Sequence, residues 1–263
     1  MKQITKNNLI IFGLLPFILG LITSFSLPPY NLILINFITF PILLFIVFEL
    51  KKSNKNAKVF FKVGWLFGFG YFLSNLYWIT YSLTHDDIFK IFIPISLILI
   101  PAFLAIFYGL STLLLFKFNY NKKITLILVF SLIFSILEFL RGNILTGFPW
   151  NLIAFSWSSS LSSLQILSLI GTYSFNLVSI TIFSLPFVFF YKNYKKTKIF
   201  ITFFLLITIS LNYFYGFQIL KKKDKINLIS SDYVVKIISP TISIDRFVKN
   251  IKGDKIGRAS CRE

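Results

Sequence analysis

Long apolar runs alternate with short basic segments along this chain. Runs of about 20 apolar residues recur, and a run of that length can cross roughly 30 Å of hydrocarbon. The runs lie at about residues 9–27, 30–50, 59–83, 91–116, 124–137, 164–191 and 199–215. The pattern predicts an all-α polytopic membrane bundle of about seven transmembrane helices.

The basic segments are distributed unevenly between the two ends of the predicted helices. The N-terminus and the loops after the second, fourth and sixth helices hold 2, 5, 3 and 4 lysines. The loops after the first, third and fifth helices hold 0, 1 and 1 basic residues. Because cytoplasmic loops are enriched in Lys and Arg, we expect a cytoplasmic N-terminus and an extracytoplasmic segment after the seventh helix.

The composition excludes several classes of protein. A chain that is 56% hydrophobic and 19% aromatic, with a mean hydropathy of +0.78, is not a soluble globular domain. The net charge of +18 would suit nucleic acid, but the lysines lie in short loops between apolar runs, as in membrane proteins. One Cys and one His are too few for a disulfide framework or a Cys/His metal site. We therefore expect no cofactor, no metal and no nucleic-acid partner.

The main candidate site is the stretch EFLRGNILTGFPWN, residues 138–151, at the end of the fifth predicted helix. Glu138 is the only acidic residue between Asp87 and Asp224, and Arg141 is similarly isolated among the arginines. Ions are costly in hydrocarbon, so such a pair is a functional candidate. On the residues alone, an ion pair at a helix end is the favoured interpretation, because residues three apart on a helix face each other.

Two features flank this stretch. Residues 142–162 form an uncharged segment rich in Phe, Trp and Ser, which we interpret as an interfacial or re-entrant loop. The third predicted helix carries Gly64, Gly68 and Gly70, small positions that let a neighbouring helix approach closely. It ends with aromatic residues suited to the membrane interface, among them Trp78.

Neither the single His nor the single Cys is predicted to be catalytic. His85 lies in a short polar loop with nothing to pair it with a nucleophile, so we interpret it as a solvated turn residue. Cys261 lies within residues 256–263, which also hold two of the four arginines. We interpret this segment as a non-native tail, in which no neighbour activates the thiol as reactive cysteines require.

The composition changes after Lys221. Tyr233–Ile238 is a strand-like run that ends at Ser239-Pro240. The chain is therefore divided into a transmembrane helical domain (residues 1–217), an extracytoplasmic segment that begins with a strand (residues 218–255) and the tail.

The motif E-x-L-R-G-x-x-x-T-G-F-P-W, which begins at Glu138, resembles a segment of the apolipoprotein N-acyltransferases. Three other blocks agree with this family in order and spacing: residues 25–30 (FSLPPY), residues 68–72 (GFGYF) leading to Tyr77-Trp78, and residues 171–174 (GTYS). The resemblance covers about residues 9–250.

The resemblance implies a bacterial inner-membrane enzyme that transfers an acyl chain from a phospholipid to the N-terminal diacylglyceryl-cysteine of lipoproteins. In the family, the acyl group passes through a thioester on a Cys, with a Glu as general base and a Lys that stabilises the oxyanion. These residues belong to an extracytoplasmic nitrilase-like domain, of which residues 218–255 would be the start. We therefore expect no catalytic residue in this chain and no activity from it alone.

The residues expected to contact substrate are Glu138, Arg141, Phe148, Pro149, Trp150 and Trp78. Two alternatives stay open: a transporter or channel that uses Glu138 and Arg141 in an ion path, and a non-catalytic membrane scaffold. A transporter is disfavoured because the chain has no second half related to the first and few intramembrane polar residues.

Overall fold

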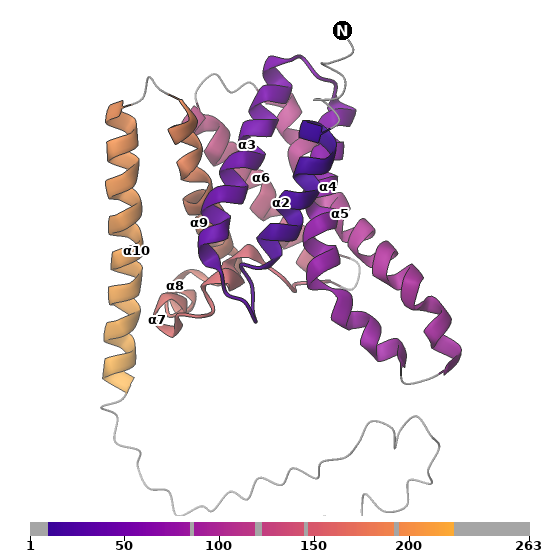
Figure 1. The fold of residues 1–263 in the computed structure, drawn as a ribbon. Coiled ribbons are helices and arrows are strands. Elements are labelled where there is room, and N and C mark those ends of the chain that lie inside the picture. Colours follow the sequence, from indigo (N-terminus) through magenta and orange to yellow (C-terminus); the bar gives the residue numbers. More distant parts are fainter. Residues whose placement is uncertain (1–9, 85–86, 119–122, 145–146, 192–194, 224–263) are drawn as a thin grey trace, which may run out of the picture.

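The computed structural model describes residues 10–84, 87–118, 123–144, 147–191 and 195–223, and within them it contains helices and loops only (Figure 1). The longer helices are α2 (Leu15–Ser24), α3 (Asn36–Lys52), α4 (Ala57–Asn75), α5 (Ile93–Lys117), α6 (Lys123–Asn143), α9 (Thr172–Ser184) and α10 (Lys195–Lys223). The shorter ones are the π-helical η1 (Ile10–Leu14), the α-helices α7 (Leu161–Leu164) and α8 (Leu167–Ile170), and the 3₁₀ segments η2 (Ile33–Ile35), η3 (Tyr77–Thr84), η4 (Asp87–Phe92), η5 (Ile153–Trp157) and η6 (Leu185–Phe190). The predicted all-α bundle is confirmed for this part of the chain. The expected strand Tyr233–Ile238, His85 and the tail lie outside the described residues.

Five helical segments are long and apolar enough to cross a membrane: Ile33–Lys52, Asp87–Lys117, Lys123–Asn143, Thr172–Phe190 and Lys195–Lys222. A sixth is the pair Ala57–Asn75 and Tyr77–Thr84, which is bent by 47°. The first apolar helix, Phe12–Ser24, is shorter than a full span as far as it is described. Five to six spans are therefore supported, and the number seven stays a prediction.

The predicted sixth helix, residues 164–191, is wrong in its first part. Residues 161–170 form the short helices α7 and α8, and the long helix begins only at Thr172. Gly171 separates the two with φ +75° and ψ 169°, a backbone conformation that an α-helix does not contain and that glycine adopts readily. The third helix also ends earlier than predicted, at Asn75, where the chain bends into η3.

The glycines predicted to allow close helix packing do so. A Cβ at Gly64 or Gly68 on α4 would overlap Tyr108 of α5, and a Cβ at Gly70 would overlap the backbone of α2 at Phe17. Such contacts between backbones are a common way for membrane helices to associate. They draw α2, α4 and α5 together around a core rich in phenylalanine.

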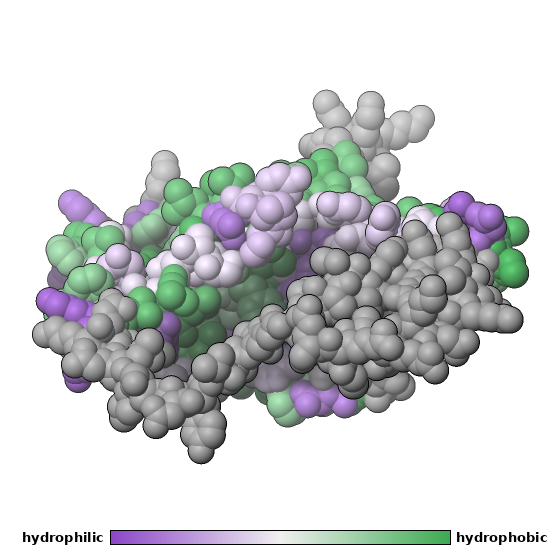
Figure 2. Space-filling view, turned by 90° about the horizontal axis from the view of Figure 1, so that it is seen from below, coloured by the Kyte–Doolittle hydropathy of each residue, from purple (hydrophilic) through white to green (hydrophobic). Residues whose placement is uncertain are grey.

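One end of the bundle, at the bottom of Figure 1, carries the ends of α2, α4 and α6 together with α7 and α8. We call it the outer end, after the predicted orientation. In the space-filling view from below, residues of weak polarity run across part of this face, with apolar residues beside them (Figure 2). The helix α10 lies at the edge of the bundle, and only 17% of its apolar window is buried.

Candidate functional site

The centre of the site is an ion pair on one face of α6. Glu138 and Arg141 are three residues apart, and Arg141 Nη2 donates to Glu138 Oε1 over 3.1 Å. Both side chains have 0% exposed surface. The isolated charges in the sequence therefore do pair with each other, and they do so inside the protein rather than at its surface.

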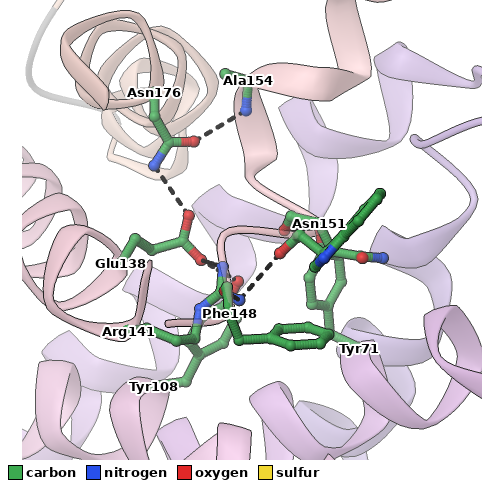
Figure 3. A network of polar contacts seen from close by, with 9 residues as sticks. Tyr71, Tyr108, Glu138, Arg141, Phe148, Asn151, Ala154 and Asn176 are labelled. Atoms are coloured by element: carbon green, nitrogen blue, oxygen red, sulfur yellow. Dashed lines mark hydrogen bonds and ion pairs between the residues drawn. The ribbon is translucent and has the colours of Figure 1, made fainter. Parts of the chain in front are cut away.

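The carboxylate of Glu138 joins α6 to two other helices (Figure 3). The hydroxyl of Tyr108, on α5, donates to Oε1 over 2.7 Å. The side-chain amide of Asn176, on α9, donates to Oε2 over 2.9 Å. Each carboxylate oxygen is thus hydrogen-bonded, which offsets the cost of removing the ion from water.

The guanidinium of Arg141 faces the loop that follows α6. Its Nη1 donates to the carbonyl oxygens of Phe148, over 2.7 Å, and Trp150, over 2.9 Å. The amide of Phe148 donates back to the carbonyl of Arg141 over 2.9 Å. The guanidinium also lies over the ring of Phe72, 5.1 Å from the ring centroid. Arg141 therefore fixes the main chain of the loop at two peptide units.

Two neutral side chains extend the same arrangement along the loop. The hydroxyl of Tyr71, on α4, donates to the carbonyl of Asn151 over 2.9 Å. Asn176 accepts a hydrogen bond from the amide of Ala154 over 2.9 Å, while its amide group serves Glu138. Arg141, Tyr71 and Asn176 thus hold successive parts of the loop in order (Figure 3).

A cavity of about 470 Å³ opens beside this loop at the outer end, and we call it the outer cavity. Trp78 and Trp150 lie on its wall with ring centroids 6.1 Å apart and planes at 69°, an edge-to-face contact. Both rings are about half exposed. The rest of the lining consists of Ser24, Leu27, Pro28, Pro29, Tyr30, Ser74, Asn75, Tyr77, Asn151, Phe155 and Ser158. None of these residues is charged, so the cavity suits uncharged polar and apolar groups.

The structure divides the residues that the sequence singled out into two sets. Glu138 and Arg141 are in the interior, and Trp78 and Trp150 line the outer cavity. Phe148 packs partly buried against the core between the two sets, and Pro149, which follows it, is exposed.

Sequence reasoning missed the neutral partners, which are Tyr71, Tyr108 and Asn176. The signal for Asn176 was present, because a polar amide within an apolar helix requires a partner in hydrocarbon. The two tyrosines carry no such signal among the 12 in the chain. In the described part of the chain, no group of three or more His, Cys, Asp or Glu residues could hold a metal ion.

The apolar helices define a polytopic membrane protein, whose interior holds an ion pair hydrogen-bonded by neutral side chains and whose outer end carries an uncharged cavity. Comparison with known proteins identifies the family. The sequence model of the apolipoprotein N-acyltransferase N-terminal domain matches residues 19–185, and the chain belongs to this family.

Several curated relatives carry the name apolipoprotein N-acyltransferase. The protein from Brucella melitensis is 28% identical over 237 residues, which is 88% of this chain and 44% of that protein. The protein from Rhodopseudomonas palustris is 34% identical over 169 residues, 64% of this chain and 31% of its own length. The protein from Rickettsia typhi is 35% identical over 192 residues, 73% of this chain and 37% of that protein. The chain thus spans less than half the length of these relatives.

Proposed function

We propose that this chain is the membrane part of an apolipoprotein N-acyltransferase of a bacterial inner membrane. The observation that carries the proposal is the match to the family's N-terminal domain over residues 19–185, a region that contains both the polar centre and the outer cavity. In such an enzyme the acyl donor is a membrane phospholipid and the acceptor is the N-terminal diacylglyceryl-cysteine of a lipoprotein. The chain crosses the membrane seven times, with its N-terminus in the cytoplasm and residues after about 218 outside.

The outer cavity receives the uncharged part of a lipid substrate, where acyl chains join the glyceryl group. Its lining offers tryptophan and tyrosine rings to hydrocarbon, and the amides of Asn75 and Asn151 to ester oxygens. A phosphate would find no cation on this wall. Trp78 and Trp150 contact the substrate directly, and Phe148 and Pro149 shape the wall behind Trp150.

The chemical step belongs to the extracytoplasmic domain. Transfer through a thioester needs a nucleophilic thiolate with a base within hydrogen-bond reach. The single Cys of this chain, Cys261, lies in residues 256–263, which we interpret as a non-native tail. The 263-residue chain therefore binds lipid but transfers no acyl group by itself.

Quenching of tryptophan fluorescence tests the cavity. The purified chain is placed in phosphatidylethanolamine vesicles and titrated with a diacylglyceryl-cysteine peptide whose acyl chains are brominated near the glyceryl group. We expect saturable quenching that is reduced in Trp78→Phe and in Trp150→Phe, because each of these variants keeps one of the two tryptophans of the cavity. The control is Trp65→Phe, because Trp65 lies on α4 with its Nε1 bonded to the carbonyl of Ala102, away from the cavity lining. Equal quenching in all four proteins would refute the assignment of the cavity.

A further inference from the structure

Arg141 does not line the outer cavity, yet it holds the main chain on both sides of Pro149. We propose that Arg141 is a positioning residue that sets the place of Trp150 on the cavity wall, with Glu138 as its counter-ion. The inference deepens the proposed function, because it matters for catalysis only if the cavity takes substrate. The geometry itself is independent of any ligand.

The contacts explain how one side chain fixes an aromatic ring that it does not touch. Nη1 reaches the carbonyls of Phe148 and Trp150 over 2.7 and 2.9 Å, so the peptide unit before Pro149 and the peptide unit after Trp150 are held at one point. Proline fixes its own φ, which leaves few free torsions between the two carbonyls. The backbone of Trp150 is thereby anchored, and its ring meets Trp78 edge to face.

Arginine is suited to this task in a way that lysine is not. The guanidinium uses two nitrogens in one plane, Nη1 for the two carbonyls and Nη2 for Glu138. A lysine ammonium concentrates its donors on one nitrogen and cannot reproduce this fork. The guanidinium also lies over the ring of Phe72, and a lysine ammonium lacks the planar group that makes this contact. Arg141→Lys therefore keeps the charge while removing the geometry.

Glu138 keeps the cation in place without reaching the loop. Its Oε1 lies 3.1 Å from Nη2, and its other hydrogen bonds come from the neutral donors Tyr108 and Asn176. These donors attach the carboxylate to α5 and α9, so the position of Arg141 is defined by three helices. Glu138→Gln retains the shape and one acceptor oxygen but removes the counter-charge.

Fluorine NMR of the chain labelled with fluorotryptophan tests the inference without a ligand. The chain has four tryptophans, so four resonances are expected, and single Trp→Phe variants assign them. In Arg141→Lys and Glu138→Gln, we expect the resonances of Trp78 and Trp150 to shift or split. The chemical shifts of Trp65 and Trp157 should not change, because their Nε1 groups donate hydrogen bonds to Ala102 and Ser179, away from the cavity. Lys90→Ala, which breaks the exposed ion pair with Asp87 at the same spacing, is the matched control.

Two outcomes overturn the inference. Unchanged resonances of Trp78 and Trp150 in both variants would mean that the loop keeps its conformation without the hydrogen bonds of the Arg141 guanidinium. Equal changes in all four resonances would mean that the pair acts only on the fold as a whole. Glu138→Gln retains an acceptor, so it covers the case in which Arg141→Lys does not fold.

A failure of the proposed function can be distinguished from a failure of this inference by measuring the affinity for the lipopeptide as well as the resonances. If the Trp150 resonance shifts in Arg141→Lys, we expect the affinity for the brominated lipopeptide to fall by about ten-fold, as for loss of an aromatic anchor. A shifted resonance with unchanged affinity would support the positioning of Trp150 and refute the outer cavity as the substrate site.

Discussion

Replacing the buried ion pair by methionines tests how much of its stabilisation is electrostatic. Removing one partner, as in Glu138→Met or Arg141→Met, leaves an uncompensated buried charge and is expected to cost about 3–5 kcal/mol. In many proteins the double hydrophobic replacement of such a pair is neutral, because both desolvated charges disappear together. Here we expect a different result, because the two charged side chains also hydrogen-bond neutral side chains and main-chain carbonyls, which would lose these partners.

The magnitude follows from the hydrogen bonds that the double variant loses. The carbonyls of Phe148 and Trp150 lose their common donor, and Tyr108 and Asn176 lose a common acceptor. An unsatisfied buried polar group costs about 1–3 kcal/mol, and some of these groups lie near the outer end, where water relieves them. We therefore expect Glu138→Met/Arg141→Met to be about 2–4 kcal/mol less stable than the original chain, and more stable than the sum of the single changes predicts.

The assay is unfolding by sodium dodecyl sulfate in mixed micelles, followed by helical circular dichroism. Lys90→Met is the control, because its partner Asp87 and Lys90 itself are exposed, and we expect its unfolding midpoint to be unchanged. A double variant as stable as the original chain would refute the reasoning, since it would mean that the neutral partners do not depend on the pair.

Three further predictions address topology, packing and chemistry. Reporter fusions at residues 55, 120 and 195 should report cytoplasm and one at residue 225 the outside; a cytoplasmic signal at 225 would contradict seven spans. Gly20→Val should lower the unfolding midpoint strongly in the same assay, because its side chain would meet the backbone of Phe67 on α4. Incubation with phospholipid should give no acyl adduct by mass spectrometry; an adduct lost in Cys261→Ser would show that the tail is reactive.

The sequence predicted the existence of the membrane helices better than their limits. Apolar runs of about 20 residues predict membrane helices independently of the rest of the fold. Two opposite charges three residues apart on a helix are likewise predicted to contact each other. The break at Gly171 was missed because the residues on both sides of it are as apolar as a helix requires. The bend after Asn75 was missed for the same reason, since Tyr77–Thr84 continues the apolar run while changing direction by 47°.

The sequence predicted which charged residues belong to the candidate site, but it did not predict how they are arranged in the structure. Glu138 and Arg141 were expected to contact substrate, and the structure encloses both side chains. What determines their burial is the approach of Tyr108 and Asn176 from helices that are distant in sequence, and no local pattern specifies such an approach. The contact between Trp78 and Trp150 has the same origin, because it depends on how the loop after α6 folds back toward η3.

The attachment of α10 has a consequence for whatever follows it in the chain. At Gly216 the helix passes so close to the carbonyl of Ser162 that no side chain fits between them, and Asn212 donates to the carbonyl of Ser163 over 3.1 Å. The residues after Lys223 therefore follow a helix that is in close contact with α7, the segment that continues the loop held by Arg141 and Asn176. We expect a shift of that loop to displace α7 and, through these contacts, the part of α10 from which the following segment starts.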